Sequence, residues 1–419
     1  MLLAITMLLM SGCQASDFRT DERYIVKVLY YVADAFMDYA GEAFMMEYPN
    51  VLIDPISFPF TTVEKFEEDL DRLIEETQPD ILFIGSIPER VQQKIRQGVL
   101  MDLSSLMWHD RDFMNKYHPG VLQATKDISG EDGIYGLSDY FTRNALYYNA
   151  SIFEYVQASV PERNIDWKRM LELAAQFKNA RTSDGKPIVG LVILEHGSLF
   201  SVISDYAASE QLYMTDLDKG PQFASEQWTS IVNDLLTGLR EGYIMIPGAI
   251  SSHLILENDR INLQNYNAAM ILGSSSWGLE LDASVWDAVP EPVGEAYQDK
   301  AYNITMNMFG INPQTEVLPA AWELLKFIVR QRAPMFQDRG DILYTYQDNR
   351  AAVDERYHSL YEFNGKLMPP IEAAPPEFFD QFAQMAEIYL QQAVDQDISV
   401  SELVATIQEN GEELWFANR

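Results

Sequence analysis

The sequence predicts an α/β protein of two lobes. Its 419 residues exceed the length over which one hydrophobic core keeps growing. Hydrophobic residues make up 47% and charged residues 22%, a balance typical of folded rather than disordered chains. Strand-like and helix-like segments alternate in two blocks that meet at residues 133–149. This alternation predicts, in each lobe, a mostly parallel sheet with helices on its faces.

The first block contains three apolar segments that read as strands, at residues 24–32, 51–58 and 80–85. Asp34 is expected to cap the helix after the first strand, and Pro49 to end it. In a parallel sheet the ligand crevice lies beyond the carboxyl ends of the strands. The loops that follow these strands are therefore expected to face a ligand.

The second block continues the alternation to the end of the chain. Asp166 and Ser225 are expected to cap two amphipathic helices, and Pro319 to begin a third. Extended segments are predicted at 187–194, 267–272, 286–289 and 303–311, and further helices at 377–395 and 400–415.

The charge of the chain excludes one class of partner. The formal net charge is -33, from 63 acidic and 30 basic residues spread along the sequence. Such a surface repels nucleic acid and anionic lipid. We expect a solvated acidic surface and no nucleic-acid partner.

The single cysteine, Cys13, follows an apolar run at residues 2–10 that is too short to cross a bilayer as a helix. The small residues Ser11 and Gly12 before it resemble a bacterial lipobox. In that interpretation residues 1–13 are a signal peptide and lipobox, and Cys13 carries a lipid anchor on the extracellular face of the membrane. An ordinary signal peptide followed by an unpaired cysteine is the alternative.

Catalytic signatures are missing from the sequence. None of the five histidines has the spacing of a zinc hydrolase, and no second cysteine is present for a thiolate site. No nucleophile elbow, P-loop or dinucleotide fingerprint occurs. We expect no enzymatic activity, no catalytic residue, no cofactor and no metal site.

The order of several short motifs resembles an extracellular solute-binding protein of an ABC importer, of the carbohydrate-binding (maltose-type) group. The motifs are PDILFIG at 79–85, GIYGLSDYFTRNALYYN at 133–149, the helix start at 167–174, AAMILGSSSW at 268–277, VPEPVG at 289–294 and GINPQTEVLPAAWELLKFI at 310–328. The resemblance runs from Tyr24 to about Trp415, nearly the whole mature chain. It is their order, more than any single motif, that carries the resemblance.

The resemblance implies a two-lobed periplasmic-binding-protein-like fold with a multi-segment hinge. Lobe 1 would comprise residues 14–137 plus 305–350, and lobe 2 residues 138–304 plus 351–419. The chain would cross between the lobes at 137–142, 303–310 and 348–357. The ligand would be trapped in the cleft when the lobes close.

The resemblance also implies which residues line the cleft. Hydroxyl, amide and carboxylate groups bind the hydroxyls of a sugar, and aromatic rings cover its C–H faces. The expected ligand-binding residues are Asp34, Ser86, Tyr140, Thr142, Arg143, Glu195, His196, Ser276, Trp277 and Phe379. A packing role for Trp277 and a capping or surface role for His196 stay open.

The predicted function is a lipid-anchored receptor that binds a carbohydrate, expected to be an oligosaccharide, and delivers it to the subunits of an ABC permease. We expect it to act as a monomer. A secreted glycan hydrolase or lyase and a ligand-sensing module for a receptor kinase are the alternatives.

Overall fold

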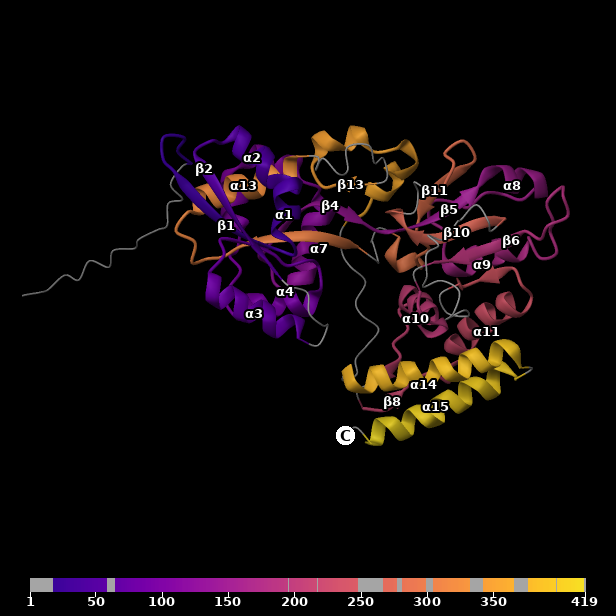
Figure 1. Ribbon diagram of the computed structural model, residues 1–419. Coiled ribbons are helices and arrows are strands. Elements are labelled where there is room, and N and C mark those ends of the chain that lie inside the picture. Colours follow the sequence, from indigo (N-terminus) through magenta and orange to yellow (C-terminus); the bar gives the residue numbers. More distant parts are fainter. Residues whose placement is uncertain are drawn as a thin grey trace, which may run out of the picture.

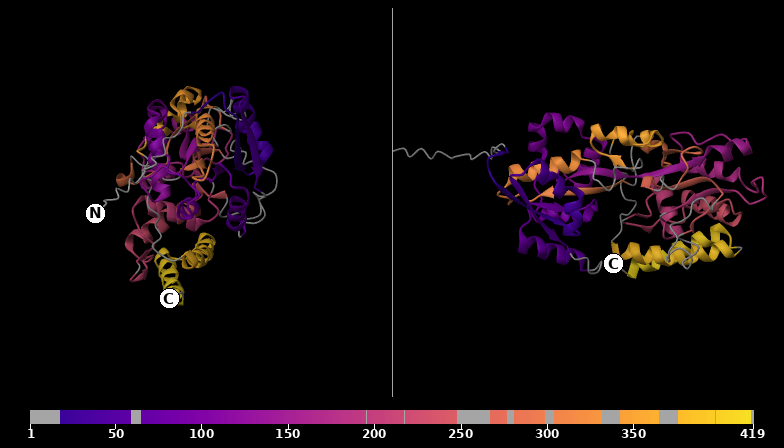
Figure 2. Two further views of the ribbon diagram at one scale, coloured as in Figure 1. Left: turned by 90° about the vertical axis from the view of Figure 1, so that its left-hand side faces the viewer. Right: turned by 45° about the horizontal axis from the view of Figure 1, so that its top comes forward.

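The structure is a computed structural model that describes residues 18–58, 65–194, 196–216, 218–247, 267–276, 281–298, 304–331, 342–364, 376–396 and 398–417. Two α/β lobes lie side by side, and strands near the middle of the molecule connect them (Figures 1 and 2). The α/β architecture of two lobes therefore agrees with the prediction from sequence.

The sheet of the first lobe has six strands in the order β13-β4-β12-β3-β1-β2. Strands β1, β2 and β3 are parallel, whereas β12 pairs antiparallel with both β3 and β4, and β13 antiparallel with β4. The sheet is therefore mixed, with a parallel half built from the first block of the sequence. The bounds are β1 Tyr24–Tyr30, β2 Val51–Ser57, β3 Ile81–Phe83, β4 Leu137–Thr142, β12 Thr305–Ile311 and β13 Leu343–Tyr344.

Helices cover both faces of this sheet, with α1, α2 and α13 on one side and α3 and α4 on the other (Figure 1). The bounds are α1 Ala33–Phe36, the π-helical segment η1 Met37–Gly41, α2 Glu42–Glu47, α3 Phe66–Thr77, α4 Pro88–Arg96, α5 Ser104–His109, α6 Arg111–Lys116, α7 Pro119–Ser129 and α13 Leu318–Arg330. The prediction that Asp34 caps the first helix was wrong. Helix α1 begins at Ala33 with Val32 as its N-cap, and Asp34 is exposed in the first turn, where its charge favours the helix dipole.

The sheet of the second lobe has five strands in the order β11-β5-β10-β6-β9. Strand β10 is parallel to β6 and antiparallel to β5, so this sheet is also mixed. Its bounds are β5 Asn144–Asn149, β6 Val189–Ile193, β9 Ile244–Met245, β10 Ala268–Ser274 and β11 Trp286–Pro290; β7 Thr215–Asp216 and β8 Gly220–Pro221 form a separate pair.

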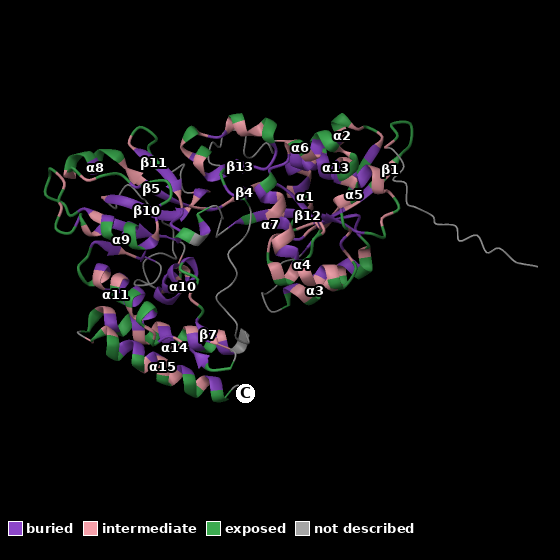
Figure 3. Ribbon diagram, turned by 180° about the vertical axis from the view of Figure 1, so that it is seen from behind, coloured by how far each residue is buried: buried purple, intermediate pink, exposed green. Residues whose placement is uncertain are grey.

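The helices of the second lobe are α8 Ala150–Val156, α9 Trp167–Ala175, α10 Leu199–Ser209, α11 Glu226–Arg240, α14 Pro376–Asp395 and α15 Val400–Ala417. Asp166 and Ser225 accept backbone hydrogen bonds as N-caps of α9 and α11, as predicted. Helices α14 and α15 form a hairpin packed on α10 and α11, with buried and exposed stripes along their length (Figure 3). This alternation explains why their apolar spacing was visible in the sequence.

The two sheets are joined where β4 ends and β5 begins. Arg143 is the residue between them. The 3-10 helices η6 Gln347–Ala352 and η7 Glu355–Tyr361 follow β13, and η7 packs on β11. The lobe boundaries expected from sequence stay a prediction; in the structure, the change from one sheet to the other falls at Arg143.

Candidate functional site

A hollow of about 280 Å³ lies where the edges of the two sheets meet. The first sheet contributes Thr142 at the end of β4 and Thr305 at the start of β12, and the second contributes Ser274 at the end of β10. Arg143, Asn144, His196 and Asp205 complete the lining. The carboxyl ends of strands from both lobes therefore face one space, as expected for α/β sheets.

The backbone between β4 and β5 holds this arrangement together. Thr142 is the register partner of Thr305, and Asn144 is the partner of Ser274. The amide of Ser275 donates a hydrogen bond of 2.7 Å to the carbonyl of Arg143. Three consecutive residues thus fix the relative position of both sheet edges at the floor of the hollow.

His196 is held rigidly against the second lobe. Its Nδ1 lies 2.9 Å from the carbonyl oxygen of Leu194, and its Nε2 lies 2.8 Å from Oδ2 of Asp205 on α10. Both ring nitrogens therefore face oxygen acceptors, and only the doubly protonated ring donates to both. With both nitrogens engaged, the orientation of the ring at the wall of the hollow is fixed.

Arg143, which was expected to contact the ligand, is buried. The residue is 3% exposed, and its guanidinium donates to Glu291 at 3.2 Å and to the carbonyl of Leu360 at 3.1 Å. Burial lowers the pKa of Arg143, and the nearby Glu291 carboxylate opposes that effect. Because Glu291 and Leu360 are distant in sequence, no local pattern could have revealed these partners.

Two other predicted residues order the loops of the first lobe. The hydroxyl of Ser86 accepts a 3.0 Å hydrogen bond from the amide of Met306, which ties the loop after β3 to β12. The hydroxyl of Tyr140 accepts a hydrogen bond from the side chain of Asn307. Both side chains are partly exposed, so part of each remains accessible to a ligand.

On the second lobe, Ser276 and Phe379 have different surroundings. Ser276 lies 3.0 Å, hydroxyl to hydroxyl, from Ser274 in the lining of the hollow. Phe379 on α14 packs beside Phe200, with ring centroids 6.1 Å apart, among the helices. The structure thus brings Thr142, Arg143 and His196 to one hollow, with Ser276 adjacent, whereas Phe379 lies in a helical cluster. Glu195, Trp277 and Cys13 lie outside the described residues.

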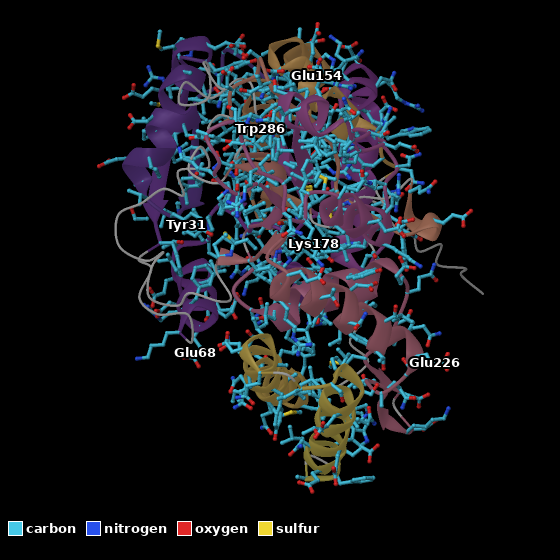
Figure 4. All side chains as sticks on the ribbon, turned by 90° about the vertical axis from the view of Figure 1, so that its right-hand side faces the viewer. Tyr31, Glu68, Glu154, Lys178, Glu226 and Trp286 are labelled. Atoms are coloured by element: carbon cyan, nitrogen blue, oxygen red, sulfur yellow. The ribbon has the colours of Figure 1, made fainter. Side chains whose placement is uncertain are left out.

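The sequence did not reveal the aromatic surface formed by Tyr31 and Phe83 at the carboxyl ends of β1 and β3. Tyr31, directly after β1, is 41% exposed, and its ring centroid lies 4.8 Å from that of Phe83. It is visible from the side of the second lobe, above Glu68 of α3 (Figure 4). The sequence interpretation placed Tyr31 inside a buried strand. The position of Tyr31 just before a loop that was expected to face the ligand could have indicated that its ring is exposed.

The comparison with protein families now decides the family. The model described as bacterial extracellular solute-binding protein matches residues 31–333. The chain belongs to this family. The resemblance seen in the motif order is thereby confirmed. Members of the family are binding proteins of ABC importers rather than enzymes.

Solved structures show that this solute-binding protein has the two-lobed fold of the family. A sugar transporter from Rhizobium etli in an open conformation matches with a TM-score of 0.65 and 15% identity, over 93% of this chain and 99% of that chain. The sugar-binding protein MalE from Xanthomonas citri matches with a TM-score of 0.63 and 15% identity, over 94% and 98%.

A third match is an ABC substrate-binding protein from Listeria monocytogenes in complex with cycloalternan, with a TM-score of 0.58 and 16% identity, over 94% of this chain and 99% of that chain. Comparison with curated proteins gave no significant match.

No described helix is both long and apolar enough to span a membrane. Within the described residues, no group of three or more His, Cys, Asp or Glu side chains is arranged to hold a metal ion.

Proposed function

We propose that this solute-binding protein captures a carbohydrate between its two lobes, closes on it by a hinge movement and delivers it to an ABC permease. The observation that carries the proposal is the hollow at the β4–β5 junction, which groups from both sheets line. A ligand that contacts both lobes favours the closed arrangement, because its contacts are complete only there.

The chemistry of the surrounding walls supports a sugar as the ligand. The lining of the hollow carries hydroxyl groups from Thr142, Ser274 and Thr305 and the amide of Asn144. The aromatic surface of Tyr31 and Phe83 lies at the carboxyl edge of the first sheet. Hydroxyls and amides bind sugar hydroxyls, and an exposed ring covers the C–H face of a pyranose.

The structures similar to this chain include proteins whose printed ligands are carbohydrates. One is a complex with cycloalternan, and another is maltose-bound MalE3 of T. maritima. These ligands favour an oligosaccharide for this chain too. Thr142, His196 and Ser276 remain our proposed contacts at the hollow, with Glu195 and Trp277 beside them in sequence.

A thermal-shift panel tests the ligand class. We expect stabilisation by oligosaccharides such as maltotriose, and none by oligopeptides or ferric citrate. Stabilisation by peptide or iron alone would overturn the carbohydrate assignment. Release of reducing ends from a glycan panel would instead support a hydrolase.

The aromatic surface gives a sharper test through Tyr31→Ala. Loss of one stacking ring should weaken binding of the stabilising oligosaccharide roughly five- to tenfold, measured by isothermal titration calorimetry. Tyr155→Ala is the matched control, since Tyr155 is also an exposed ring, 60% exposed, but lies on α8 and not at the carboxyl edge of the first sheet. Equal affinities for the two variants would show that Tyr31 does not contact the ligand.

We propose further that a lipid on Cys13 holds the protein, as a monomer, at the extracellular face of the membrane. In cells that express Cys13→Ala, the protein should move from the membrane fraction to the medium. Retention of the variant in the membrane fraction would contradict the anchor without affecting the ligand assignment.

A further inference from the structure

A second hollow, of about 520 Å³, lies at the β11 edge of the second sheet. Strand β11 is at one edge of this sheet, whereas β10 and β6, whose ends carry Ser274 and lead to His196, lie further across it. Figure 1 shows β11 and β13 on the upper side of the molecule, away from α10 and α14. We call this hollow the rear pocket; its volume is in the range of small-molecule sites. It is lined by Arg143, Arg163, Asn164, Pro290, Glu291, Val293, Gln298, Glu362, Phe363 and Asn364.

The walls of the rear pocket are tied to both sheets. Phe363 stacks on His118, with ring centroids 5.0 Å apart, and meets Phe141 of β4 edge-on at 5.6 Å. On the opposite wall, the amide of Val293 donates to the carbonyl of Ile165 in the second lobe at 3.2 Å. A molecule in the rear pocket would therefore touch groups fixed to the first sheet and groups fixed to the second.

The floor of the rear pocket is polar and buried. Arg143 is 3% exposed and Glu291 is 4% exposed, and their side chains form an ion pair of 3.2 Å. The Nε–H of Arg143 has no acceptor among the described residues. This atom is itself buried, so a molecule in the rear pocket would meet the Arg143–Glu291 pair and not the Nε–H. Arg143 also contributes to the lining of the hollow in the cleft, so one residue joins the two spaces.

The charges of the rear pocket select against ions. Arg143 pairs with Glu291, and Arg163 at the rim pairs with Glu362. An anion would face two carboxylates and a cation two guanidinium groups, so neither is favoured. The other lining groups are the exposed side-chain amides of Asn164, Gln298 and Asn364 and the largely buried ring of Phe363. Amides that donate and accept, beside an aromatic ring, suit an uncharged molecule with several hydroxyls.

We propose that the rear pocket is a second binding site, for a small uncharged polyhydroxyl molecule of monosaccharide or polyol size. Because its walls belong to both sheets, an occupant favours the relative position of the lobes that its contacts require. By reciprocity, such a ligand and the ligand in the cleft change each other's affinity by the same factor. The site does not depend on the proposed function, since it would exist whatever the cleft binds.

Saturation-transfer NMR with D-glucose and D-mannitol as probes, and sulfate as competitor, tests the site. Thr305→Trp fills the cleft hollow from an exposed position, and Asn164→Trp fills the rear pocket from an exposed rim position. Asn115→Trp, at an exposed position on α6 outside both hollows, is the control. Circular dichroism confirms that each variant is folded.

We expect Thr305→Trp and Asn115→Trp to retain saturable binding of at least one probe. Sulfate should not displace that probe. Adding Asn164→Trp to Thr305→Trp should weaken that binding at least tenfold. The proposal is overturned if Thr305→Trp alone binds neither probe, if Asn164→Trp changes nothing, or if sulfate displaces the probe. Failure of the proposed carbohydrate site in the cleft would be a separate result: the affinity for the oligosaccharide would be unchanged in Tyr31→Ala.

Discussion

At the scale of single residues, two buried titratable groups near the hinge respond to pH in opposite directions. His118 caps α7, accepting from the amide of Val121 at 3.2 Å, and its Nε2–H donates to the carbonyl of Tyr361 at 2.9 Å. Asp139 of β4 is fully buried and accepts a hydrogen bond from the hydroxyl of Tyr39. Both side chains connect elements that are distant in sequence.

Burial lowers the pKa of His118 from 6.5 to about 4, and the charges of Arg350 and Arg143 act in the same direction. The unfolded chain therefore binds a proton between pH 6.5 and 4 that the folded protein does not. The stabilisation is complete above pH 6.5 and is lost as the pH falls through about 4, by roughly 3 kcal/mol in the free energy of unfolding. Urea unfolding of His118→Asn should show this dependence removed. His109→Asn, an exposed control, should retain it.

Burial raises the pKa of Asp139 from 3.8 to about 7, although the hydrogen bond from Tyr39 opposes the shift. Here the folded protein keeps a proton that the unfolded chain has lost. Stability is therefore greatest below pH 3.8 and falls as the pH rises through about 7, by roughly 4 kcal/mol. The Asp139→Asn variant should show no such decrease between pH 5 and 8. An unchanged slope would mean that Asp139 is ionised in the folded protein.

At the scale of elements, strand β6 shows how close packing fixes a helix against a sheet. A Cβ added at Gly190 would lie 2.2 Å from the carbonyl oxygen of Ala174 on α9, which is closer than atoms can approach. Helix α9 can lie this near to β6 because position 190 carries no side chain. Since α9 contributes Trp167, Met170 and Leu173 to the core, moving it would disturb much of the second lobe.

Gly190→Ala should lower the free energy of unfolding by roughly 1–3 kcal/mol, because the backbone of α9 must shift to make room. Gly197→Ala is the matched control, since nothing lies within 4 Å of the Cβ added there. Chemical denaturation of the two variants compares them directly. Equal stabilities would show that α9 moves away from β6 at no cost.

At the scale of the whole molecule, the proposed function requires the lobes to move. At the β4–β5 connection the chain passes from one sheet to the other through Arg143 alone. A ligand bound in the cleft hollow should draw the lobes together. Small-angle X-ray scattering should then show a smaller radius of gyration at saturating oligosaccharide. Thr305→Trp, with its hollow filled, should show no ligand-dependent change; an unchanged radius in the native protein would argue against closure on binding.

Much of the architecture could be predicted from sequence because it depends on local patterns. The apolar segments at 24–32, 51–58 and 286–289 became β1, β2 and β11, and the spacing in the last hundred residues became α14 and α15. The caps at Asp166 and Ser225 were visible for the same reason, since a cap involves residues three apart. The short strands β9 and β13 were missed, because two residues carry no periodicity.

The sequence by itself determined the two α/β blocks, the family resemblance and the loops where a ligand was expected. Only the tertiary structure decided which side chains share a space. Arg143 became a buried partner of Glu291, Tyr31 became an exposed ring, and the β11 edge became the wall of a second pocket. The reason is physical: periodicity records which face of an element is apolar, whereas a buried ion pair or an exposed ring depends on elements that only folding brings together.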